Sequence, residues 1–258
     1  MTEGKFKKNT KSVIIRFYAE LNDFLRPSVR QKDVDYLFLG PQTAGEAIES
    51  MGVPHSEVDL ILVNGHSVKL NHKLNNGDQI SVYPVFESID ISPIIRTRKV
   101  PLRTTKFILD AHLGKLAKYL RMFGFDSCYE NDYEDSTIIK IAQEEQRIIL
   151  TRDKDLLMSK DISHGYYVRA IHIKEQLREI IEKFDLYSQA APFTRCILCN
   201  NTIVSVRKED IRKRLDEDTA RIFKKFYYCS TCDKIYWEGS HFDRMSKYIR
   251  QLLEQRST

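Results

Sequence analysis

Two cysteine pairs near the end of the chain have the spacing of a metal site. Cys196 and Cys199 form one CxxC pair, and Cys229 and Cys232 form a second pair after 29 intervening residues. Paired CxxC turns can direct four thiolates into a tetrahedron around zinc, and a cytosolic chain disfavours disulfides. Four protein ligands would fill the coordination shell, so we expect a structural zinc ion in preference to redox pairs or an iron–sulfur cluster.

Four aspartates in the middle of the chain form a second candidate constellation. Asp110 follows the apolar run FIL, Asp153 and Asp155 follow RIIL, and Asp135 precedes a helix near the end of FDSCY. In open parallel sheets, ligands bind beyond the carboxyl ends of the strands, so we expect the four carboxylates to meet at one rim. Clustered carboxylates repel one another unless a cation neutralises them, and hard oxygen ligands select magnesium or manganese. This pattern predicts metal-assisted cleavage of a nucleic-acid backbone.

Each aspartate also has a purely structural explanation. Asp135 could cap the helix that follows it, and Asp155 could cap a short helix over LLMSK, because Asp is a preferred N-cap residue. Asp110 has the stronger functional case, since a buried strand should not end in a charge directed into the crevice without a reason. Asp132 and Glu134 lie beside Asp135, so either could supply that carboxylate instead.

Basic residues near the aspartates are candidates for contacts with RNA phosphates. Lys115, Lys118 and Arg121 are predicted on the polar side of the helix after Asp110, and Arg152 directly precedes Asp153. A solvated basic face explains the three helix residues at least equally well.

The elements that must position these residues alternate between strands and helices. From Phe107 onward, short apolar runs such as FIL, RIIL and YYVRAI are separated by helical patterns such as STIIKIAQEEQ and IKEQLREIIEKF. Repeated β-α-β units predict a three-layer α/β fold with a parallel sheet and right-handed crossovers.

The first part of the chain predicts a separate α+β domain. Strand patterns surround the helical stretch TAGEAIESMG, and Asn64-Gly65 is a hairpin signal. VNGHSV followed by NNGDQISVYPVF resembles the ubiquitin-like sulfur carriers of thiamine and molybdopterin synthesis. Those carriers act through a free C-terminal Gly-Gly, whereas this chain continues through Glu87-Ser88-Ile89. Sulfur transfer is therefore excluded for this domain, which leaves binding or scaffolding.

Composition and charge fit a folded protein that meets nucleic acid. The chain is 42% hydrophobic and 30% charged, with no uninterrupted apolar stretch of membrane-spanning length and no signal peptide, so we expect a cytoplasmic protein without membrane contact. Residues 1–106 carry a net charge of +3, residues 107–190 of −3, and residues 191–258 of +5. Basic segments around an acidic centre suit a metal-ion nuclease, although unevenly distributed surface charge is the simpler explanation.

The central and C-terminal motifs together resemble the Mut-seven C-terminal RNase family, a branch of the PIN-like nucleases. The stretches that match are FILDAHLGKLAKYLRMFGFD, NDYEDSTIIKIAQEE, RIILTRDKDLL, the cysteine pairs and EGSHFDRM. The resemblance implies a PIN-like fold and divalent-metal RNase activity, with Asp110, Asp135, Asp153 and Asp155 at the acidic positions. The expected architecture is a β-grasp domain, a PIN-like domain and a zinc ribbon.

We expect the following domain organisation from these patterns. The predicted parts are a flexible N-terminus over 1–11, a ubiquitin-like domain over 12–90, a basic linker over 91–106, a PIN-like nuclease domain over 107–190, and a zinc ribbon with a C-terminal helix over 191–258.

The sequence leaves several roles open. The segment between the cysteine pairs contains Phe223, Phe226, Tyr227 and Tyr228 among basic residues, which could grip RNA by stacking or form a local core beside the metal. The ubiquitin-like domain could recognise RNA, a protein, or the nuclease itself. The competing function for the whole chain is a catalytically inactive RNA-binding or scaffold protein.

Overall fold

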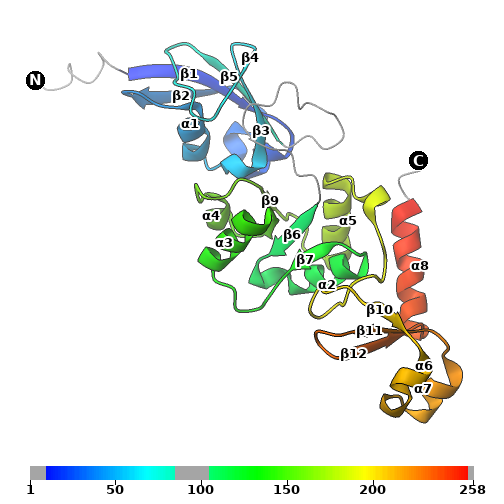
Figure 1. Cartoon of the computed structure of the whole chain (residues 1–258). Coiled ribbons are helices and arrows are strands. Elements are labelled where there is room, and N and C mark those ends of the chain that lie inside the picture. Colours follow the sequence, from blue (N-terminus) through cyan, green and yellow to red (C-terminus); the bar gives the residue numbers. More distant parts are fainter. Residues whose placement is uncertain (1–9, 85–104, 255–258) are drawn as a thin grey trace, which may run out of the picture. The chain divides into compact units, whose positions relative to one another are not determined.

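The computed structural model describes residues 10–84 and 105–254 (Figure 1). The described residues form two compact units. The first unit joins residues 10–84 with residues 139–167, and the second joins residues 105–138 with residues 168–254. Most of the predicted flexible N-terminus and of the predicted basic linker lies outside the described residues, and the predicted domain bounds stay predictions.

The N-terminal part of the first unit is a β-grasp fold. Its five-stranded sheet has the order β2-β1-β5-β3-β4, in which β1 pairs in parallel with β5 and antiparallel with β2. Helix α1 covers the sheet with Ala47 and Ile48, which lie in the same apolar core as the strands. The elements are β1 (Thr10–Phe17), β2 (Val34–Leu39), α1 (Ala44–Ser50), β3 (Val58–Val63), β4 (His66–Val68) and β5 (Gln79–Pro84).

Local sequence signals explain how this fold forms. Val13, Ile15 and Phe17 alternate along β1 and are all buried, as expected of a strand with one core face. Thr43 caps α1 in a reciprocal capping box with Glu46. The predicted hairpin at Asn64-Gly65 is confirmed: both residues have positive φ angles, 50° and 80°, and they connect the antiparallel strands β3 and β4.

The rest of the first unit contains a pair of parallel strands with helices beside them. Strand β8 (Ile148–Thr151) is fully buried and pairs in parallel with β9 (Gly165–Tyr167). Helix α3 (Asp135–Glu145) begins in the second unit and precedes β8, and the short helix α4 (Lys154–Leu157) packs on β8 and β9.

The second unit begins with another pair of parallel strands. Strand β6 (Lys106–Leu109) pairs in parallel with β7 (Asp126–Cys128), and α2 (Gly114–Met122) connects them. Helix α5 (Ile173–Lys183) packs against α2. Strands β6 and β7 pair in parallel, as do β8 and β9, and helices alternate with these strands along the chain, which confirms the predicted α/β class.

The C-terminal part of the second unit is a small ribbon followed by a long helix. Strands β10 (Val204–Val206), β11 (Phe226–Cys229) and β12 (Lys234–Trp237) form an antiparallel sheet in that order. Helices α6 (Lys208–Ile211) and α7 (Glu217–Ile222) lie between β10 and β11 in the sequence, and α8 (Ser240–Glu254) follows β12 (Figure 1). Tyr248 of α8 makes edge contacts with Tyr119 and Phe123, which fixes α8 against the end of α2.

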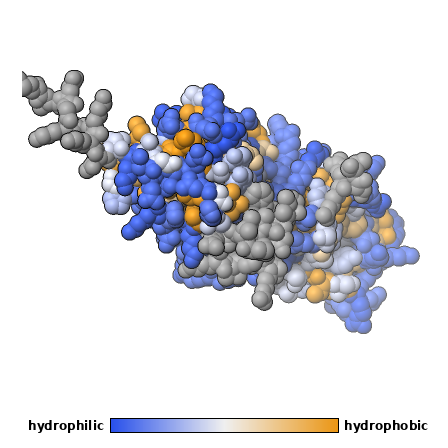
Figure 2. Space-filling model, turned by 90° about the horizontal axis from the view of Figure 1, so that it is seen from above, coloured by the Kyte–Doolittle hydropathy of each residue, from blue (hydrophilic) through white to orange (hydrophobic). Residues whose placement is uncertain are grey.

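The surface is largely polar on the face seen in Figure 2, where apolar residues occur in small separate patches. Among the helices of residues 10–84 and 105–254, none is long and apolar enough to cross a membrane.

We expect Gly124 to tolerate no side chain. It has a φ of +92°, and a Cβ at this position would lie 2.1 Å from the carbonyl oxygen of Ala191. Gly40 is the matched control, because it also has a positive φ, +75°, but a Cβ there would meet nothing within 4 Å. Gly40→Ala should cost about 1–2 kcal/mol in the free energy of unfolding, and Gly124→Ala about 2–5 kcal/mol. Equal losses in urea denaturation would contradict the steric argument.

Candidate functional site

Asp110 lies at the carboxyl end of β6, as predicted. Its side chain is buried, with 8% of the residue exposed, and it occupies the N-cap position of a short 3-10 turn over Ala111–Leu113. The backbone carbonyl of Asp110 accepts a hydrogen bond of 2.9 Å from the Leu113 N–H, but its carboxylate makes no capping bond. Turn formation therefore does not explain why an acidic side chain occupies this buried position.

Asp135 is the first residue of α3 and is exposed. The N–H groups of Thr137 and Ile138 donate to the backbone carbonyl of Glu134. Asp132 and Glu134 are exposed as well, so the choice among the three neighbouring carboxylates stays a prediction.

The structure corrects the capping role that the sequence suggested after β8. Asp153, and not Asp155, is the N-cap of α4: its Oδ1 accepts hydrogen bonds from the N–H groups of Asp155, at 2.8 Å, and Leu156, at 3.4 Å. The reason is that β8 ends at Thr151, whose hydroxyl accepts the Asp153 N–H at 2.8 Å and turns the chain two residues earlier than expected. Asp155 lies inside the helix and is exposed.

The ubiquitin-like fold holds the segment that follows these aspartates. The 3-10 turn His55–Glu57 makes three hydrogen bonds to backbone groups of α4 and β9 and of the loop between them. His55 Nε2 lies 2.8 Å from the Ile162 carbonyl oxygen, and the Ser56 hydroxyl donates to the Leu157 carbonyl oxygen at 3.3 Å. The Tyr167 N–H donates to the carboxylate of Glu57, which is only 2% exposed.

Aromatic packing reinforces the same contact. The Tyr167 ring packs on the apolar core of the β-grasp fold and meets Phe24 edge to face, with ring centroids 5.6 Å apart. The ammonium group of Lys154 lies 5.1 Å from the Phe24 centroid and 5.6 Å from the Tyr167 centroid. Within the first unit, the ubiquitin-like fold therefore braces the segment in which Asp153 and Asp155 lie.

The predicted RNA-contacting residues differ in their exposure to solvent. Lys115 and Lys118 are exposed, as predicted, and Arg152 is half-buried. The prediction that Arg121 lies on the polar side of α2 is wrong, because this residue is only 2% exposed. Its guanidinium group has protein partners and does not face solvent.

Arg121 instead joins the first CxxC knuckle, residues 196–199, to strand β7. Its Nε donates to the Ser127 carbonyl oxygen at 2.9 Å, one terminal nitrogen donates to the carbonyl oxygens of Ile197 and Leu198, and the other donates to Tyr129. Four of the five N–H donors of a guanidinium are thereby satisfied. Burial lowers the pKa of Arg121, and the nearby Cys128 thiol opposes this effect.

A second set of bonds attaches the same knuckle to β7. Asn200 accepts the Ser127 N–H at its Oδ1, at 2.9 Å, and donates from its Nδ2 to Asp126 at 2.8 Å. Arg195 donates to the Gly124 carbonyl oxygen at 3.1 Å and forms an ion pair with Asp126. No pattern in the sequence predicts this role for Arg195 and Asn200.

The four cysteines converge as predicted and could hold a metal ion such as zinc. Their sulfurs all lie within 4.8 Å of one another. The Cys196–Cys232 distance is 3.3 Å, the Cys199–Cys229 distance is 3.4 Å, and the Cys199–Cys232 distance is 3.7 Å. A tetrahedral zinc ion with Zn–S bonds of about 2.3 Å separates its sulfurs by about 3.8 Å, so the donor set fits.

Backbone conformation and hydrogen bonds give the four cysteines different environments. Asn200 and Asp233 directly follow the two CxxC pairs and have positive φ angles of 68° and 55°, a conformation that Asn and Asp adopt more readily than most residues. Burial opposes ionisation of Cys196, but hydrogen bonds from the Tyr236 hydroxyl and from backbone N–H groups lower its pKa to about 6. Burial raises the pKa of Cys232.

The aromatic residues between the cysteine pairs have different environments. Phe226 is only 1% exposed and belongs to the core of the ribbon. Phe223 and Tyr227 line a pocket together with His241, whereas the Tyr228 hydroxyl donates to Asp233 at 2.7 Å. The local-core explanation therefore applies to Phe226, whereas stacking of the other aromatic residues on RNA stays a prediction.

Within the described ranges, the cysteine cluster is the one group of three or more metal-binding side chains whose donor atoms converge. Asp110 and Asp135 belong to the second unit, and Asp153 and Asp155 to the first. That the four carboxylates bind a catalytic ion together stays a prediction.

Comparison with known proteins defines the class of the chain. The family model of the Mut7-C RNAse domain matches residues 105–249, and that of the Mut7-C ubiquitin domain matches residues 10–90. The chain therefore belongs to the Mut7-C RNAse domain family and has the N-terminal ubiquitin-like domain that the sequence predicted. No curated protein and no solved structure matches the chain.

Replacement of one buried ligand should remove the metal. We expect zinc analysis of Cys229→Ser to give a large loss from the roughly stoichiometric content of the unaltered protein, because three thiolates and a hydroxyl bind zinc poorly. Cys128→Ser is the matched control, since Cys128 lies outside the cluster and should leave the zinc content unchanged. Equal zinc content in both variants would refute the assignment of the ligands.

Loss of the Glu57 carboxylate should release the Tyr167 amide. A hydrogen bond to a charged group contributes about 1.5–3 kcal/mol, so Glu57→Ala should accelerate hydrogen exchange at this amide by about tenfold or more. Glu57→Gln keeps an acceptor oxygen and should have a smaller effect. Exchange measured on peptides that cover β9 decides the point, and unchanged protection in Glu57→Ala would show that the brace does not hold this strand.

Proposed function

We propose that the chain is a metal-dependent ribonuclease that hydrolyses RNA phosphodiester bonds. Its predicted ligands for magnesium or manganese are Asp110, Asp135, Asp153 and Asp155. The observation that carries the proposal is that the Mut7-C RNAse domain family covers the same stretch, residues 105–249, in which all four aspartates occur. Carboxylates are the donors that these hard cations prefer, so the donor set fits the ion.

Asp153 can serve as a cap and as a ligand at the same time. Both capping hydrogen bonds end on its Oδ1, and within the described part of the chain its Oδ2 accepts no hydrogen bond. The capping bonds fix the rotamer of the side chain, which would hold Oδ2 in one direction. The structural and the functional explanations of this residue are therefore compatible.

Other residues of the chain suit the substrate. The exposed ammonium groups of Lys115 and Lys118 on α2 would attract backbone phosphates, and Arg152 would contribute a further positive charge next to Asp153. Magnesium or manganese, when bound, would activate a water molecule and stabilise the leaving oxygen. Thr151 would keep the acidic loop in place through its bond to the Asp153 N–H.

The remaining modules have supporting roles in this proposal. The four-cysteine cluster holds a structural zinc ion, because four thiolates leave no open coordination position for a reacting water. The ubiquitin-like domain braces the α4–β9 segment and can in addition present its outer surface to a protein or RNA partner.

The test uses substitutions that remove charge while they keep the fold. Asp153→Asn preserves the N-cap, because Asn caps helices as well as Asp does, so the protein should remain as stable as the unaltered chain. We expect Asp110→Asn and Asp153→Asn each to lower RNA cleavage by at least about 100-fold, since even residues that merely support metal ligands contribute about 10–100-fold.

Cleavage is measured on labelled single-stranded, hairpin and transfer RNAs with manganese, magnesium or a chelator. Asp161→Asn is the matched control, because Asp161, like Asp153, is an exposed aspartate of the first unit, and it lies outside the proposed ligand set. Metal-dependent products that disappear in Asp110→Asn and persist in Asp161→Asn would support the nuclease. Absence of any metal-dependent product would instead identify an inactive RNA-binding or scaffold protein.

A further inference from the structure

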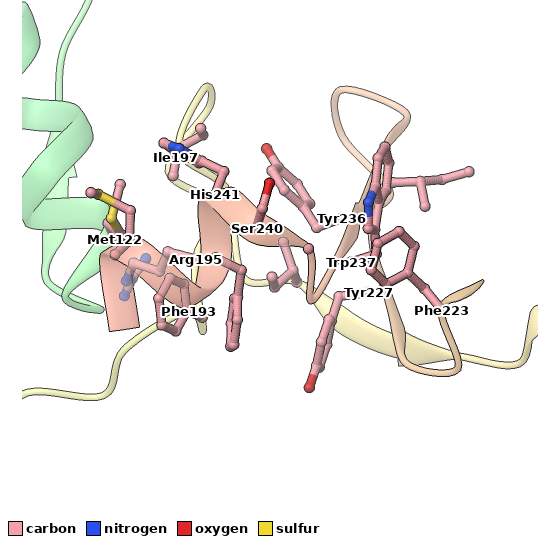
Figure 3. Close-up of a pocket in the computed structure, with 15 residues that line it drawn as sticks. Met122, Phe193, Arg195, Ile197, Phe223, Tyr227, Tyr236, Trp237, Ser240 and His241 are labelled. Atoms are coloured by element: carbon pink, nitrogen blue, oxygen red, sulfur yellow. The ribbon is translucent and has the colours of Figure 1, made fainter. Parts of the chain in front are cut away.

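A large aromatic pocket lies in the second unit, between the zinc-ribbon strands and the start of α8. Its volume is about 530 Å³, within the range of about 300–1,000 Å³ that is typical of ligand sites. Figure 3 shows Tyr227, Tyr236 and Trp237 on the ribbon side, with Ser240 and His241 on α8. No residue of the proposed acidic site belongs to this pocket.

The pocket has an open aromatic wall. Trp237 is 39% exposed although it is a large apolar residue, and its ring centroid lies 6.4 Å from that of Phe223 at an angle of 38° between the planes. Phe226, which precedes Tyr227 in the same strand, is by contrast completely packed. The exposed ring of Trp237 and the half-buried ring of Phe223 are therefore not fully packed in the core of the ribbon, and they offer faces on which a flat ligand can stack.

A glycine keeps this wall free. Gly239 lines the pocket, and a Cβ at this position would lie 3.2 Å from the indole nitrogen of Trp237 and 3.5 Å from the Phe223 ring. Its φ is not in the left-handed region, so backbone conformation does not require glycine here. The limited space beside the rings of Trp237 and Phe223 explains the glycine more directly than backbone conformation does.

Among the charges next to the wall, Glu238 is paired with Lys225 and Asp243 is exposed, and two further cations favour a polyanion. Lys224 directly follows Phe223, and Arg244 directly precedes the lining residue Met245. Both cations are exposed, and neither forms an ion pair with any residue that the structure describes. Residues 191–258 carry a net charge of +5, so the pocket lies in the most basic part of the chain.

We propose that this pocket binds an unpaired nucleobase of single-stranded RNA, which stacks on Phe223 and Trp237 while Lys224 and Arg244 contact the flanking phosphates. Flat aromatic faces beside unpaired cations are the chemistry by which proteins hold single strands. The choice of RNA rests on the proposed ribonuclease function. The pocket would hold the strand at a point separate from the acidic residues.

The chain contains its own reporter for this site. Trp237 is its only tryptophan, so selectively excited indole fluorescence reports on the pocket wall alone. A twelve-nucleotide single-stranded RNA without added magnesium or manganese should quench this signal. An abasic oligomer of the same length and charge should bind more weakly and leave the signal nearly unchanged, because it has no base to stack.

Two kinds of substitution separate stacking from charge. Phe223→Leu should weaken RNA binding by about fivefold or more, whereas Tyr228→Leu, the matched aromatic control outside the pocket, should not. Lys224→Gln together with Arg244→Gln should weaken the RNA and the abasic oligomer alike and reduce the salt dependence of both. These two substitutions are on the surface, so they keep the test valid if Phe223→Leu fails to fold.

Each outcome decides the proposal. Equal quenching by the abasic oligomer would reduce the site to a basic patch and overturn base binding. Absence of a response to any RNA would overturn it too, and would leave a protein segment as the occupant of the apolar wall. RNA that quenches Trp237 in a base-dependent way but is never cleaved would uphold the pocket and sink the nuclease function instead.

Discussion

The architecture of the second unit depends on one buried guanidinium. Arg121 lies at the end of α2, yet its N–H groups bind carbonyl oxygens in β7, in the segment just after it, and in the first CxxC knuckle. A buried cation is costly unless its donors are satisfied, so these carbonyls must stay where they are. Asn200 completes the arrangement, because its side-chain amide accepts the Ser127 N–H of β7 and donates to the Asp126 carboxylate. The ribbon is thereby fixed to the nuclease-like fold.

The features that could be predicted from the sequence are those encoded within a few residues. The cysteine knuckles, the Asn64-Gly65 hairpin, the capped helix α1 and the strand-helix alternation all depend on local spacing or local patterns, and the structure contains each of them. Arg121 could not be placed in this way. Its partners at Ile197 and Leu198 lie more than seventy residues further along the chain, and a helical arginine normally faces water.

The acidic loop illustrates a smaller limit of sequence interpretation. Asp155 is a possible cap from the sequence, but the hydroxyl of Thr151 turns the chain early and makes Asp153 the cap. A hydrogen bond between neighbouring residues decides at which residue such a short helix begins. Helix propensity alone does not predict this bond. The aromatic segment behaves similarly, because Phe226 and Tyr227 have equal propensities, and only the topology of the ribbon determines which of them is buried.

The turn His55–Glu57 has a consequence for how such a protein can change over time. It crosses the border between the two families, since its partners Leu157, Ile162 and Tyr167 lie in the RNAse domain match. All three partners contribute backbone groups, which substitution of their side chains cannot remove. The two family matches therefore divide this chain between residues 90 and 105, whereas the compact units of the structure divide it at other positions. A different ubiquitin-like fold could replace the present one only if it supplied an equivalent turn.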